Sequence, residues 1–124
     1  MNQQIKEHWV AALRSGEYQQ TTGELRNGNG FCCLGVLCDL YLKEKGKQWE
    51  VVSEDCFYFP ALNLEVLPKE VMDWAELSSY NPNVTVERFN HAIQEDTPLN
   101  IELSYLNDTD HDFKMIAALI EEQL

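Results

Sequence analysis

The longest apolar stretch of the chain runs from Phe31 to Leu42, and Asp39 is the one charged residue within it. Twelve residues are too short to cross a bilayer, which needs about 20 apolar residues. The length and the apolar positions on several faces predict a buried helix over 31–45 at the centre of the fold. Gly35 weakens such a helix by about 1 kcal/mol relative to alanine, which indicates that another element crosses it closely.

Two further helices are predicted near the ends of the chain, where apolar residues recur with helical spacing. The first covers residues 4–14 and ends at Gly16, which suits a left-handed cap. The second covers Phe113–Leu124, and Asp110 or Asp112 supplies its N-terminal cap. We expect both helices to pack on the central one through their apolar stripes (Ile5, Trp9, Ala12 and Leu13; Phe113, Ile116, Ala117, Ile120 and Leu124).

Strand-forming residues lie on both sides of the central helix. They predict a small, mostly antiparallel sheet from roughly residues 18–26 and 49–59, with a turn at 53–55. A short helix is expected from Leu67-Pro68 to about residue 77. Residues 84–86 fit either a third strand or the lead-in to a short helix at 87–94, and a helical segment is expected over 98–106. The predicted architecture is one α+β domain over residues 1–124, with the central helix buried.

The charge is strongly unequal along the chain. The net charge is −12, of which residues 1–62 contribute −2 and residues 63–124 contribute −10. An acidic half of this kind repels phosphate, so we expect no direct binding of nucleic acid. It serves either solubility or docking on a basic protein surface, with these acidic residues as the candidates: Asp108, Asp110, Asp112, Glu121 and Glu122. The polar N-terminus does not resemble a signal peptide, so we expect a cytoplasmic protein without a membrane partner.

Four cysteines stand at 32, 33, 38 and 56. Their spacing does not match a zinc motif, and thiols in an apolar run usually act as small hydrophobic residues. A cysteine nucleophile at 32 or 33, with a histidine as base, stays open as an alternative. The aspartates at 108, 110 and 112 alternate as in a calcium loop, but the glycine and the final glutamate of that loop are missing. We therefore expect no metal and no cofactor.

A polar segment before the central helix suggests a ligand site. Arginine can bind a carboxylate or phosphate through two hydrogen bonds, tyrosine can stack, and glutamine can hydrogen-bond. The segment offers Arg14, Tyr18, Gln20 and Arg26 for a nucleotide or another small ligand. The structural alternative is that the arginines pair with nearby glutamates and Gln20 holds loop backbone.

Several segments together resemble a family of small bacteriophage and prophage proteins, and the first two are distinctive in combination: LRSGEYQQ at 13–20, CCLGVLCDL at 32–40, Leu67-Pro68 to Trp74-Ala75, and Leu106-Asn107-Asp108 to Ile120-Glu121. The resemblance implies a phage or mobile-element origin and brings no assigned catalytic residue. By analogy with other small acidic phage proteins, it implies a non-enzymatic protein that binds and inhibits a basic host protein, such as a defence factor, in the host cytoplasm. A small-ligand binding protein and a small cysteine-dependent enzyme are the alternatives.

Overall fold

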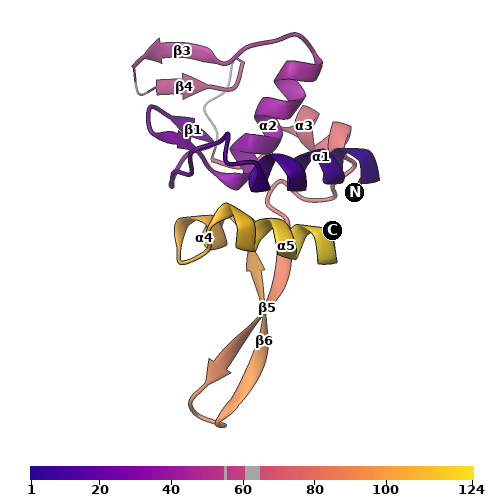
Figure 1. Ribbon diagram of the computed structural model, residues 1–124, viewed down its shortest axis with the longest axis vertical. Helices are drawn as coiled ribbons and strands as arrows, with labels where there is room; N and C mark the ends of the chain where they lie inside the picture. The colour runs from indigo at the N-terminus through magenta and orange to yellow at the C-terminus, as the bar shows by residue number, and fades with distance from the viewer. Residues whose placement is uncertain (55, 61–64) are drawn as a thin grey trace.

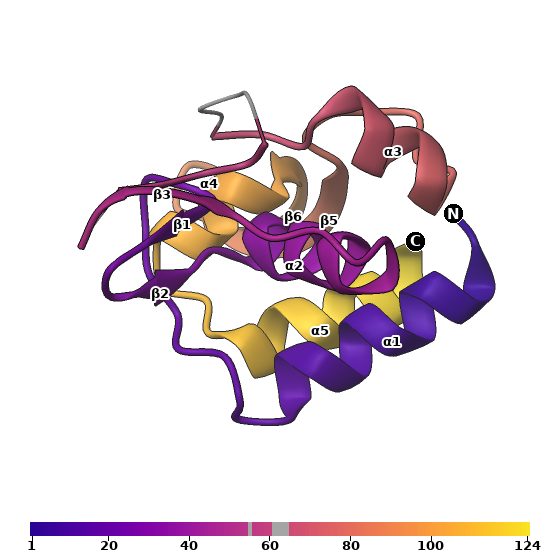
Figure 2. The same cartoon turned by 90° about the horizontal axis from the view of Figure 1, so that it is seen from above.

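Helix α2 (Cys33–Glu44) lies at the centre of the molecule, as predicted, and nine of its twelve residues are buried. In this computed structural model, residues 1–54, 56–60 and 65–124 are described. The other elements are drawn in Figures 1 and 2: α1 (Gln3–Arg14), β1 (Arg26–Asn27), β2 (Gly30–Phe31), β3 (Glu50–Ser53), β4 (Cys56–Tyr58), α3 (Lys69–Ala75), β5 (Asn83–Asn90), β6 (Glu95–Glu102), α4 (Leu103–Asp108) and α5 (Phe113–Gln123). Helices and short antiparallel strands confirm the α+β class.

The start of α2 differs by two residues from the prediction. Phe31 belongs to strand β2, and Cys32 is the N-cap, whose sulfur accepts the N–H of Gly35 at 3.3 Å. The expected close crossing at Gly35 is confirmed. A Cβ atom on this residue would overlap the carbonyl oxygen of Leu25, so the loop before β1 touches the α2 backbone directly.

Both terminal helices are confirmed, and Figure 2 shows α1 and α5 side by side. Asn2 caps α1, and the side chain of Asp112 caps α5 by accepting the N–H of Met115 at 2.9 Å. Trp9 of α1 is fully buried and donates its indole N–H to the carbonyl of Cys33 at 3.0 Å. Helix α1 is thereby joined to the first turn of α2.

The predicted sheet has four strands in the order β2-β1-β4-β3, and neighbouring strands are antiparallel. In the segment 18–26, where the first part of the sheet was expected, only one bridge forms before residue 26, between Gln20 and Phe31, and the first hairpin lies at 26–31. Residue 55 of the predicted turn lies outside the described residues. The predicted helix after Pro68 is α3, which ends where Glu76 adopts a left-handed conformation with φ of 57°.

The strand alternative for residues 84–86 is confirmed as part of β5, whereas the helix at 87–94 and most of the helix predicted at 98–106 are wrong. Strands β5 and β6 form a regular hairpin from Asn83 opposite Glu102 to Asn90 opposite Glu95, and only residues 103–108 are helical. Val84 and Val86 are buried at the base of this hairpin, which ties it to the core. Figure 1 shows that its far end extends away from the helices.

Among the described residues, no helix has both the length and the apolar character that a bilayer crossing requires.

Candidate functional site

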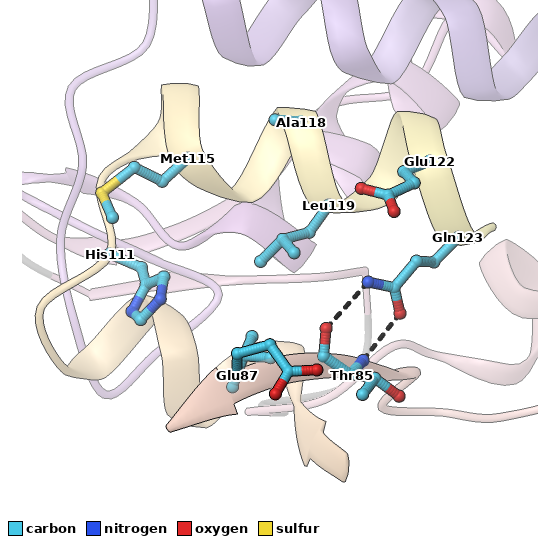
Figure 3. Close-up of a pocket in the computed structure, with 9 residues that line it drawn as sticks. Thr85, Glu87, His111, Met115, Ala118, Leu119, Glu122 and Gln123 are labelled. Atoms are coloured by element: carbon cyan, nitrogen blue, oxygen red, sulfur yellow. Dashed lines mark hydrogen bonds between the residues drawn. The ribbon is translucent and has the colours of Figure 1, made fainter. Parts of the chain in front are cut away.

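A groove of about 600 Å³ runs between helix α5 and strand β5 (Figure 3). Its floor is apolar, and carboxylates and amides stand along its sides. The lining residues are Thr85, Val86, Glu87, His111, Met115, Ala118, Leu119, Glu122 and Gln123. Met115 is 48% exposed, so the groove offers apolar surface that the chain itself does not cover.

One end of the groove is closed by a pair of hydrogen bonds between Gln123 and the backbone of Thr85 (Figure 3). The N–H of Thr85 donates to Oε1 of Gln123 at 2.6 Å, and Nε2 donates back to the Thr85 carbonyl at 2.8 Å. Both backbone groups of Thr85 therefore face away from β6. Because outward and inward positions alternate along an antiparallel strand, Glu87 and Phe89 present their backbone groups on the same free edge.

The outer edge of β6 is blocked in a different way. Pro98 stands opposite Glu87, at a position whose backbone nitrogen faces away from β5. Proline has no N–H to offer, and a proline on an edge strand hinders pairing with a further strand. The hairpin thus has one protected edge, on β6, and one open edge, on β5 beside the groove.

Further apolar side chains are exposed along the hairpin beyond the groove. Phe89 is 50% exposed, Ile93 55% and Leu99 45%. The ring of Phe89 meets the imidazole of His91 edge to face, with centroids 4.8 Å apart. The part of the hairpin beyond the groove therefore exposes apolar side chains as well.

The five predicted partner-binding residues are all exposed: Asp108, Asp110, Asp112, Glu121 and Glu122. Three of them have structural contacts. Asp108 accepts the N–H of Gly23 at 3.2 Å, Asp112 caps α5, and Glu121 pairs with Arg14 at 2.9 Å. Only Glu122 lines the groove.

Sequence reasoning missed the other groove residues because it left residues 84–86 open between a strand and the lead-in to a helix at 87–94. The available signal was the alternation of Val84 and Val86 with the polar residues Thr85 and Glu87. If this segment is a strand, Thr85 and Glu87 lie together on the face opposite to Val84 and Val86.

The predicted ligand residues Arg14, Tyr18, Gln20 and Arg26 are separated into three places. Arg14 lies on α1 and forms an ion pair with Glu121. Gln20 holds loop backbone, as the structural alternative predicted: its Nε2 donates to Oδ1 of Asn107 and to the His111 carbonyl, each at 3.0 Å. Only Tyr18 and Arg26 lie near each other, both in contact with the ring of Phe31.

Asp39 connects Tyr18 to the central helix α2, and the Asp39 side chain is almost completely buried. Its carboxylate accepts the Tyr18 hydroxyl at 2.6 Å and the Trp49 indole N–H at 3.0 Å, and lies 3.0 Å from Nζ of Lys43. Burial acts to raise the pKa of Asp39, but these three donors outweigh it and hold the pKa below its ordinary value of 3.8. Asp39 is therefore an ionised carboxylate whose partners are all provided by the chain.

The thiols at 32, 33 and 38 lie in the core, and burial raises the pKa of each. For Cys32 the pKa rises to about 11. A nucleophilic cysteine requires an accessible thiolate, so these environments give the cysteine-enzyme alternative no support. In the part of the chain that the structure describes, no three Cys, His, Asp or Glu side chains are grouped as metal ligands.

Comparison with known proteins gives one match, to a family model that covers the whole chain. No curated protein and no solved structure matches the chain. Since the family model aligns with residues 1–124, the chain belongs to the family described as "Domain of unknown function (DUF8296)".

Proposed function

We propose that this chain is a protein-binding domain that captures an extended segment of a partner protein by adding it as a strand to the free edge of β5. The observation that carries the proposal is the open edge at Glu87 and Phe89, which runs directly beside the α5 groove. Strand addition to an exposed sheet edge is a recurring mode of peptide recognition.

The groove suits the side chains of such a segment. In an extended segment, alternate side chains point to the same face. The side chains that face α5 would contact Met115, Ala118 and Leu119, which form an apolar surface in the groove. The main-chain groups of the segment would hydrogen-bond to Glu87 and Phe89, beyond the point where Gln123 closes the edge.

The charges of the groove select a basic segment. Glu87 and Glu122 stand on opposite walls, and residues 63–124 carry a net charge of −10. A segment that alternates apolar residues with lysine or arginine would pair with both carboxylates and lower the repulsion within this half of the chain. The sequence predicts a partner with a basic surface, and we propose that the part of this partner that binds is an extended basic segment.

The identity of the partner is a finer proposal. The resemblance to phage proteins supports a host protein whose activity is blocked when its segment is held in the groove. The support is the resemblance together with the acidic charge of the chain, and no catalytic group is needed for this action.

Selection of displayed 12-residue peptides against the whole chain tests the proposal. We expect selected peptides to alternate apolar and basic residues, and to change the amide NMR signals of Glu87 and Phe89 on binding. Ala118→Arg places a large cation in the groove and should weaken binding at least tenfold. Ala11→Arg, at an exposed alanine of α1, is the matched control and should bind as the wild type does.

A second variant tests the strand edge itself. Glu87→Pro removes the outward N–H but leaves the ladder with β6 intact, as Pro98 already does across the hairpin. We expect it to abolish binding. Peptides that bind Ala118→Arg and Glu87→Pro as well as the wild type, or that share no apolar and basic alternation, would refute the proposal.

A further inference from the structure

A second cleft, of about 510 Å³, lies between α2 and the four-stranded sheet and gathers three of the nine cations of the chain: Arg26, Lys43 and Lys47. Figure 1 shows these elements at the opposite end of the molecule from the tip of the β5–β6 hairpin. In a chain with a net charge of −12, a cleft with this excess of cations stands apart from the rest of the surface.

The guanidinium of Arg26 is held by aromatic rings. Its central carbon lies 4.0 Å from the ring centroid of Phe57, 4.7 Å from that of Phe31 and 5.7 Å from that of Trp49. Stacking of this kind fixes the plane of the guanidinium and leaves its N–H groups free to donate. Burial lowers the pKa of Arg26, a sign that part of its water shell is already lost.

The charge of Asp39 acts on this guanidinium and opposes the effect of burial on the Arg26 pKa, but it does not neutralise the guanidinium through an ion pair. Among the described carboxylates, none forms an ion pair with Arg26. Asp39 lines the same cleft, but its oxygens already accept from Tyr18 and Trp49 and pair with Lys43. Within the described part of the chain, the Arg26 guanidinium makes no side-chain hydrogen bond, and none of its nitrogens is fully buried.

Apolar side chains line the cleft beside the cations. Val51 is 64% exposed on β3 and lies opposite Phe57 of β4, whose ring also packs on the Arg26 guanidinium. A flat ring can stack on this surface while acidic oxygens reach Arg26 and Lys47. We propose that this cleft binds a small molecule that combines anionic oxygens with a flat aromatic body. The site is independent of the β5 edge and uses none of its residues.

Titration of the whole chain with AMP, benzoate and inorganic phosphate tests the inference, followed through the indole N–H signal of Trp49 by NMR. We expect AMP or benzoate to bind with a Kd below about 1 mM, which corresponds to about −4 kcal/mol, and to bind at least tenfold more tightly than phosphate. The choice between the two ringed anions identifies whether the anionic group is a phosphate or a carboxylate.

Two variants locate the site. Arg26→Lys keeps a cation but loses the planar, stacked fork, and should weaken binding at least tenfold. Lys47→Gln changes an exposed side chain of the cleft, leaves the fold intact and should weaken binding about threefold. Lys114→Gln, on the exposed side of α5, is the charge-matched control and should have no effect.

Three results would overturn the inference. The first is the absence of binding by both ringed anions at 1 mM. The second is a phosphate affinity equal to that of AMP, which would indicate a general cationic surface. The third is unchanged binding in Lys47→Gln together with unchanged binding in a folded Arg26→Lys.

Discussion

Asn107 holds the start of the central helix from a position 74 residues away in the sequence: its Oδ1 accepts the backbone N–H of Cys33 at 3.1 Å. The same side chain accepts from Gln20 and donates to the carbonyl of Thr21 at 2.8 Å. Asn107 is 1% exposed, so water cannot replace these partners. One buried amide therefore joins α4, α2 and the loop that follows α1.

Replacing this amide should destabilise the whole fold. In Asn107→Ala, the N–H of Cys33 and the carbonyl of Thr21 lose their partner while buried, and each loss costs about 1–3 kcal/mol. We expect a decrease of about 3 kcal/mol in the free energy of unfolding, measured by urea denaturation. Asn100→Ala, at an exposed position of β6, should change it by less than about 0.5 kcal/mol. Equal effects of the two variants would contradict the role given to Asn107.

Asp39 predicts a defined pH dependence. The pKa of a free aspartate is about 3.9, and the donors around Asp39 hold its folded-state pKa lower. Its contribution to stability is therefore fully present above about pH 4 and is lost as the pH falls through the folded-state pKa. Asp39→Asn lacks this charge and should be about 2 kcal/mol less stable than the wild type at pH 7.

The difference between Asp39→Asn and the wild type should shrink below pH 4, because the wild-type carboxylate is then protonated as well. Denaturation curves at pH 7, 5, 4 and 3 measure this convergence. Asp110→Asn, an exposed aspartate, serves as the control. A stability gap that stays constant from pH 7 to pH 3 would show that the charge of Asp39 is not what stabilises the network.

Gly35 predicts a steric effect in the core. Because a Cβ atom would overlap the Leu25 carbonyl oxygen, Gly35→Ala requires the loop to move away from α2, even though alanine favours a helix. We expect a loss of at least about 3 kcal/mol, at the upper end of the usual cost of overpacking. Gly46→Ala is the control, since no atom lies within 4 Å of its added Cβ and only the φ of +67° opposes it. It should cost about 1 kcal/mol. A smaller loss for Gly35→Ala than for Gly46→Ala would contradict the close crossing.

The cysteines predict a simple labelling pattern. Cys56 is partly exposed, whereas the thiols at 32, 33 and 38 are buried and their pKa values are raised. At pH 8 a disulfide reagent should modify one thiol per native chain, and Cys56→Ser should abolish this reaction. All four thiols should react in denaturant. Rapid modification of Cys32 or Cys33 in the native chain would return the cysteine-enzyme alternative to consideration.

Helices α1, α2 and α5 could be predicted from the sequence because their signals are local. The stripe of α1, the apolar run of α2 and the capped, amphipathic α5 each lie within a dozen consecutive residues. The close contact at Gly35 was also predictable, because a glycine that weakens a core helix usually marks a place where a Cβ atom would not fit. The hairpin was not predictable in the same way. Residues 87–94 contain neither glycine nor proline, and their local preferences do not separate helix from strand.

The sequence by itself determined that the chain buries the apolar run at 31–42 and carries most of its negative charge in the second half. Both properties follow from the composition of a stretch of consecutive residues. Only the tertiary structure decided that Pro98 blocks one edge of a hairpin while Glu87 lies on the open one. It also decided that Arg26 enters an aromatic cleft and Arg14 does not. These relationships join residues that are far apart in the chain, and the free energy that selects them comes from packing and cross-strand hydrogen bonds that exist only in the folded state.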